Sequence, residues 1–175
     1  MIMGKYILFF VIVFSLGAVA HVELPTARYV DTARYIGKWY TVTSMPQFYT
    51  RTCTGQTAEY ALLNEKNISI QNVCLKENGK TAKISGIGTI RDAPNNARLT
   101  VRFKKIWWKM LGLKSEYVII KLSDAYDTVM VGSTNRASLW IMSRTPTIDP
   151  EILEEYKTLA RDLGFKVQKL ENSKY

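Results

Sequence analysis

Short apolar segments alternate with polar residues along most of the chain from residue 38 onward. The cleanest alternation lies at residues 98–103, where Leu99, Val101 and Phe103 share one face. Turn residues such as Asn78-Gly79 separate the segments at intervals typical of antiparallel β structure. The pattern predicts strands at residues 38–45, 56–62, 68–74, 83–91, 98–103, 117–122, 128–133 and 139–143.

The predicted connections are short enough for successive strands to pair. We therefore expect an all-β fold, an eight-stranded antiparallel up-and-down β-barrel, because closure leaves no free strand edge. A barrel of about eight strands is just wide enough to hold one small ligand. A β-sandwich is the alternative, since alternation alone does not separate the two folds.

The apolar period changes from two to helical spacing after residue 148. Asp149 is a good N-cap, Pro150 suits the first helical position, and Gly164 suits the end of a helix. The sequence therefore predicts one C-terminal α-helix packed on the outside of the barrel, over the strand that carries Tyr40 and Val42. Residues 165–170 are expected to add a short final strand.

The first 20 residues have the pattern of a cleaved signal peptide, with Lys5 before an apolar run and a small-residue site at 18–20. A membrane anchor is the alternative, but the run is short for a span of about 20 residues. We expect one exported domain over residues 21–175, periplasmic or secreted, with no lipid-anchor cysteine. Cys53 and Cys74 flank one predicted hairpin, so a disulfide is favoured over two free thiols.

The net charge is +9, or +8 once the predicted signal takes Lys5 away. Such a charge suits nucleic acid or anionic lipid, and export argues against nucleic acid. The one histidine is His21, at the expected mature N-terminus, which is a poor position for a catalytic base. No metal site, cofactor or enzymatic activity is expected from these residues.

Three segments in order resemble the signatures of the lipocalins, closest to the branch of bacterial outer-membrane lipocalins and apolipoprotein D. They are residues 37–40, Gly-Lys-Trp-Tyr, residues 124–127, and residues 139–146. The resemblance extends over residues 35–164 and implies structural roles for Gly37, Trp39 and Arg144. Trp39 would plug the closed end of the barrel, and Arg144 would lie across its ring while donating to nearby carbonyls.

Strand alternation, taken with the family's ligand positions, predicts which side chains face a cavity. Counting from Trp39, residues 41, 43 and 45 would point inward. Gly86, Gly88 and Gly132 favour an open cavity over an interior filled with side chains. The predicted ligand-binding residues are Met45, Phe48, Ala58, Tyr60, Leu62, Ile70, Leu99, Val101, Phe103, Trp108, Met130, Trp140 and Met142.

The predicted connection from Lys104 to Lys114 should lie at the open mouth. It carries Trp107 and Trp108 among four lysines. It could fold back as a lid or contact an anionic membrane surface, and the two are compatible.

The sequence as a whole predicts a carrier of a fatty acid or lysophospholipid. The resemblance implies lipid transport or storage for envelope maintenance, peripheral to the outer membrane. The alternatives are a carrier of a retinoid, haem or pigment, and an enzyme such as a lipid isomerase on the same barrel.

Overall fold

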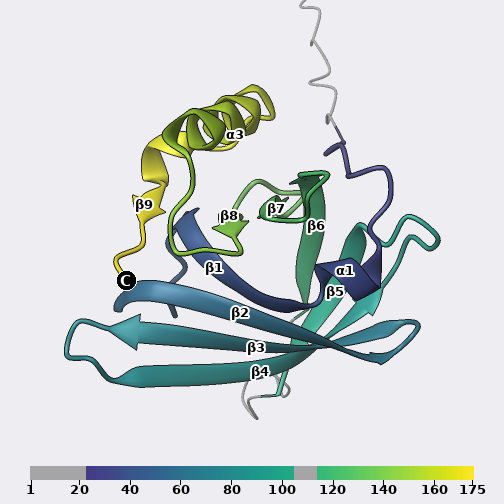
Figure 1. Cartoon of the computed structure of the whole chain (residues 1–175), viewed down its shortest axis with the longest axis horizontal. Coiled ribbons are helices and arrows are strands. Elements are labelled where there is room, and N and C mark those ends of the chain that lie inside the picture. The colour runs from purple at the N-terminus through teal and green to yellow at the C-terminus, as the bar shows by residue number, and fades with distance from the viewer. Residues whose placement is uncertain (1–22, 105–113) are drawn as a thin grey trace, which may run out of the picture.

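The computed structural model describes residues 23–104 and 114–175. Its strands form one antiparallel sheet in which each strand pairs with the next, and β1 pairs with both β2 and β8. The sheet is therefore closed, which confirms the eight-stranded up-and-down barrel and excludes the sandwich (Figure 1). The barrel strands are β1 Gly37–Ser44, β2 Cys53–Asn64, β3 Asn67–Lys76, β4 Thr81–Ile90, β5 Arg98–Phe103, β6 Ser115–Leu122, β7 Thr128–Gly132 and β8 Leu139–Ser143.

One end of the barrel is closed by the short helix α1, Thr32–Tyr35, and the start of β1. Gly37 joins them with a φ of 94°, a conformation that favours glycine. Trp39 is fully buried, and its indole N–H donates to the Tyr35 carbonyl at 2.9 Å. The Arg144 guanidinium lies over the Trp39 ring, so the predicted closed end is confirmed.

The predicted C-terminal helix is α3, Pro150–Asp162, which is capped by the Asp149 side chain. The helix lies on the outside of the barrel (Figure 1), and its buried residues, Tyr156 and Ala160, share a core cluster with residues of β6, β7 and β8. The expected position over Tyr40 and Val42 is wrong, because the apolar surface beneath the helix is Met45, Val118, Ile120, Met130, Leu139 and Ile141. We call these six residues the helix seat.

The C-terminal segment differs from the predicted strand at residues 165–170. The chain forms a 3₁₀ turn, η1 Val167–Lys169, and only then the two-residue strand β9, Glu171–Asn172, beside β1. Beyond β9, the Lys174 N–H donates to the Thr54 carbonyl at 2.6 Å, and the Tyr175 hydroxyl donates to the carbonyls of Thr41 and Gln56. This tail joins β1 and β2 where their own pairing has ended at Tyr40.

The predicted disulfide is present between Cys53 and Cys74, with a Cα–Cα distance of 5.2 Å. It links β2 to its neighbour β3 at the end of the hairpin away from the connecting turn. Among the described residues, no helix is both long and apolar enough to span a bilayer.

Candidate functional site

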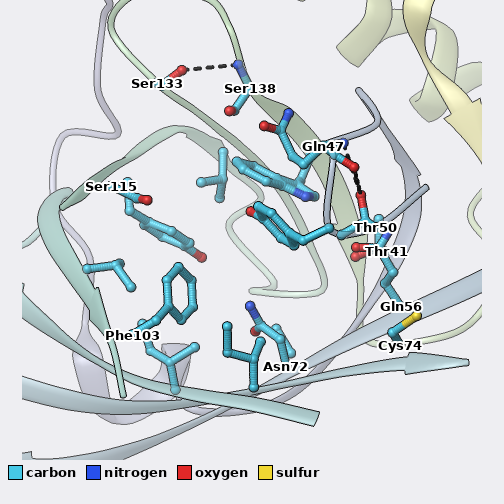
Figure 2. Close-up of a pocket in the computed structure, with 18 of the residues that line it drawn as sticks. Thr41, Gln47, Thr50, Gln56, Asn72, Cys74, Phe103, Ser115, Ser133 and Ser138 are labelled. Atoms are coloured by element: carbon cyan, nitrogen blue, oxygen red, sulfur yellow. Dashed lines mark hydrogen bonds between the residues drawn. The ribbon is translucent and has the colours of Figure 1, made fainter. Parts of the chain in front are cut away.

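A cavity of about 740 Å³ occupies the barrel interior. It extends from the tyrosines near the closed end to the loops between β1 and β2 and between β7 and β8, which form its mouth (Figure 2). The side chains that make up its apolar wall are Ala58, Ile70, Ala82, Ile84, Val101, Phe103, Val131, Trp140 and Met142.

The register of β2, β3 and β4 arranges one side of this wall in rows. Ala58, Asn72 and Ile84 form one row, and the next row toward the closed end consists of Tyr60, Ile70 and Gly86. Because side chains alternate between the two faces of a sheet, both rows point into the barrel. The space at Gly86 is taken by the Phe103 ring, which would lie 3.1 Å from an added Cβ. The glycines therefore admit neighbouring side chains instead of enlarging the cavity.

Three tyrosine hydroxyls form a hydrogen-bonded chain at the inner end of the cavity. Tyr35 and Tyr117 are 2.6 Å apart, and Tyr117 donates to Tyr60 at 3.0 Å. Burial raises the pKa of Tyr60 to about 12 and raises the pKa values of Tyr35 and Tyr117 well above 10.0. These hydroxyls are therefore neutral at physiological pH, and they offer hydrogen bonds without charge.

Asn72 is the second polar feature inside the barrel. Its amide oxygen is buried and has no hydrogen-bond partner among the described residues. In register it lies between Ala58 and Ile84, which cannot donate to it. Sequence reasoning missed this residue, although the predicted inward position of Ile70 places Asn72 on the same face of its strand.

The mouth is polar. The Gln47 side chain donates to the Ala137 carbonyl at 3.3 Å, which connects the loop after β1 to the turn before β8. Glu116 accepts from the backbone and hydroxyl of Thr134. Lys114 also lines the mouth, and Figure 2 shows Gln47, Ser133 and Ser138 together at this end.

Eight of the predicted ligand-binding residues line the cavity. They are Phe48, Ala58, Tyr60, Ile70, Val101, Phe103, Trp140 and Met142. Leu99 faces inward but lies in the core around Trp39 instead of on the cavity wall. Trp108 lies outside the described residues, as do Trp107 and most of the segment between Lys104 and Lys114.

Two predicted orientations are wrong, and a third predicted residue lies beyond the end of the cavity. Met45 belongs to the helix seat because the register of β1 against β8 shifts between Thr41 and Thr43, which reverses the alternation. Met130 pairs with Ile141 and faces outward with it, also into the helix seat. Leu62 lies near the β2–β3 turn at the closed end and is 41% exposed.

Among the described residues, metal-binding side chains do not gather in this cavity. Within residues 23–104 and 114–175, no three His, Cys, Asp or Glu side chains are grouped so that they could hold a metal ion. The charged residues of the lining, Lys83, Lys114 and Glu116, are all exposed. The arrangement suits noncovalent binding of a largely apolar molecule.

A closed antiparallel barrel around an apolar cavity suits the noncovalent binding of a small hydrophobic molecule. A family model described as a lipocalin-like domain matches residues 30–175, and the chain belongs to the lipocalin family. This membership supports the binding of a hydrophobic ligand.

Several relatives are similar over most of the chain. The outer membrane lipoprotein Blc of Escherichia coli K12 is 30% identical over 140 residues, which cover 79% of this chain and 76% of that protein. Apolipoprotein D of Bos taurus is 24% identical over 162 residues, covering 90% of this chain and 82% of that protein. Among solved structures, lobster apocrustacyanin A1 has the same fold, with a TM-score of 0.62 and 14% identity over 88% of this chain and 91% of that one.

Proposed function

We propose that the protein carries a fatty acid or a lysophospholipid, with the acyl chain in the barrel cavity. The observation that supports this most is the cavity itself, whose volume of about 740 Å³ lies within the range of small-molecule sites. Its wall is apolar, while its charged residues are confined to exposed positions. A single-chain amphiphile, which has one apolar chain and one polar head group, matches this separation of an apolar wall from exposed charged residues.

The expected affinity follows from the buried chain. Each CH₂ removed from water contributes roughly 0.8 kcal/mol, so about ten methylenes contribute roughly 8 kcal/mol before the cost of ordering the chain. That corresponds to a dissociation constant of about 1 μM or weaker. A basic residue at the mouth, Lys114, is placed to attract an acidic head group.

The proposal extends to where the protein works. Residues 1–20 act as a cleaved signal, and residues 21–175 form one exported domain. Similarity to proteins named outer membrane lipoprotein and apolipoprotein D supports export. We place its role in lipid transport or storage at the cell envelope, as a carrier and not an enzyme.

Membrane contact belongs to the same proposal. The segment from Lys104 to Lys114 leads into β6 at the mouth, and its sequence combines two tryptophans with four lysines. Phe48, in the loop after β1, is 63% exposed. Aromatic and cationic side chains together suit an anionic bilayer surface, where the ligand would be collected or released.

A matched pair of variants tests the cavity as the binding site. Ala58→Trp adds a large ring on the cavity face of β2, whereas Ala61→Trp adds the same ring on the exposed face. In titrations with the fluorescent fatty acid cis-parinaric acid, we expect wild type and Ala61→Trp to bind and Ala58→Trp to lose at least tenfold in affinity. Equal binding by all three proteins, or no binding by the wild type, would count against the proposal.

The natural ligand can then be identified directly. Native mass spectrometry of the exported protein should show a bound mass that extraction identifies as a fatty acid or lysophospholipid. Recovery of a retinoid, haem or pigment would replace the proposed ligand while leaving the carrier role intact.

A further inference from the structure

In the chain of three tyrosine hydroxyls, one proton has no acceptor among the described residues. Each hydroxyl carries one proton. The three hydroxyls therefore carry three protons but share only two hydrogen bonds, and with Tyr117 donating to Tyr60 the Tyr60 proton is not used within the chain. The Tyr60 proton therefore remains, and among the described residues no acceptor takes it. Tyr60 lines the cavity, so an acceptor would have to come from the cavity side.

Asn72 supplies a second donor in the same space. Figure 2 shows its amide nitrogen pointing into the cavity among the labelled side chains. The row of Asn72 is one step nearer the mouth than the row of Tyr60, about 7 Å along β2. Its neighbours on the cavity face, Ala58, Ile84 and Ile70, are apolar. The amide nitrogen can donate to an oxygen of a ligand, whereas the buried amide oxygen, which has no partner among the described residues, accepts only from a ligand donor such as a hydroxyl.

Both donors are neutral, and their surroundings oppose charge. The charged residues of the lining are exposed, and none of them belongs to the two rows that carry Tyr60 and Asn72. This end of the cavity is buried from water, which raises the pKa values of all three tyrosines and likewise disfavours an anion. A carboxylate or phosphate therefore fits the mouth and not the interior.

We propose, on the basis of the proposed carrier function, that the preferred ligand is an oxygenated fatty acid. Its acidic end lies at the mouth, and a ketone or hydroxyl along its chain accepts a hydrogen bond from Tyr60, with Asn72 as the second donor. A plain saturated chain leaves both donors unsatisfied. The protein thus discriminates among lipids by an oxygen atom inside the barrel.

The test compares stearic acid with a set of oxostearic acids that carry one ketone at different positions along the chain. Competition against cis-parinaric acid gives each affinity. In the wild type we expect at least one oxostearic acid to bind roughly five- to tenfold more tightly than stearic acid. In Tyr60→Phe, which removes only the donor, this ratio should fall to about one. Tyr29→Phe, at a tyrosine that is 59% exposed, should keep the ratio of the wild type.

A second variant and a spectroscopic measurement keep the test independent of folding. Asn72→Leu should reduce the ratio without removing a tyrosine. The infrared stretch of a ¹³C-labelled ketone should move to lower wavenumber on binding to the wild type, and less so on binding to Tyr60→Phe. If the wild type binds stearic acid as tightly as every oxostearic acid, this inference is wrong while the carrier function stands. If no fatty acid of either kind binds, the proposed function fails as well.

Discussion

The guanidinium carbon of Arg144 lies 3.9 Å from the centre of the Trp39 ring. The same guanidinium donates to the carbonyls of Arg34, Tyr35, Lys38 and Tyr126 at 2.8–3.1 Å. One side chain from the end of β8 therefore holds together α1, the start of β1 and the turn before β7. Both residues act in the structure of the closed end, far from the mouth.

Replacing Arg144 with lysine should lower the free energy of unfolding by about 2 kcal/mol. Lysine keeps the charge but loses the planar fork that serves several carbonyls at once and stacks on the indole. Urea denaturation would measure the loss, and Arg51→Lys, at an exposed position, is the matched control. Equal stability of the two variants would show that the fork is not needed.

The disulfide offers a second stability test. Cys53 and Cys74 are 21 residues apart. In the chain-entropy model, a disulfide that closes a loop of that length stabilises the folded state by about 3 kcal/mol. The double variant Cys53→Ala/Cys74→Ala should lose about that much in urea denaturation. A reductant should destabilise the wild type to a similar extent and leave the double variant unaffected. A wild-type midpoint that does not respond to reductant would contradict the prediction.

The tyrosine chain predicts a loss of stability in alkaline solution. Burial raises the pKa of Tyr60 from 10.0 to about 12, so between these values the unfolded chain releases a proton that the folded one keeps. Stability is therefore complete below pH 10 and declines above it, by about 1.4 kcal/mol per pH unit for each such tyrosine. Urea midpoints across this window should fall less steeply for Tyr60→Phe than for Tyr29→Phe. Parallel curves would contradict the assignment.

Two methionines on adjacent strands face opposite sides of the barrel wall. Met130 is fully buried in the helix seat beneath α3, whereas Met142 lines the cavity. Met130→Ala should cost about 3 kcal/mol in stability and leave the affinity for cis-parinaric acid unchanged. Met142→Ala should weaken binding severalfold. If Met130→Ala weakened binding as much as Met142→Ala does, the two faces of the wall would not be independent.

The mouth should bind anionic membranes. We expect the protein to co-sediment with phosphatidylglycerol vesicles, more weakly at high salt, and the variant Trp107→Ser/Trp108→Ser to remain in the supernatant. The control is Leu62→Ser/Leu63→Ser, which removes two exposed leucines at the closed end. Identical sedimentation of all three proteins would remove membrane contact from the proposed function.

Alternation located the eight barrel strands because each has one face inside and one outside. Alternation gave the wrong face where a single extra residue in a strand exchanged the inward and outward positions. The register shift between Thr41 and Thr43 reversed Met45, and nothing in the local sequence marks that shift. The final strand was misplaced because η1 intervenes before β9, and β9 is defined by its pairing with β1 instead of by its own pattern.

The polar features of the site were the least predictable part. Tyr35 and Tyr117 are 82 residues apart, and only the closed barrel brings their hydroxyls together. Asn72 was not predicted because the expected lining was apolar, and an inward-facing amide does not fit that pattern. Sequence thus predicted the wall of the cavity better than the few groups on it that could select a ligand.

The alternation of β8 has a practical consequence. Leu139 and Ile141 belong to the helix seat. The residues that alternate with them, Trp140 and Met142, face the cavity. A library that varies only the second pair would sample new ligand preferences while the outer packing of the barrel stays constant. Within five consecutive residues, β8 therefore presents two surfaces that can be designed separately, one facing the cavity and one facing the helix seat.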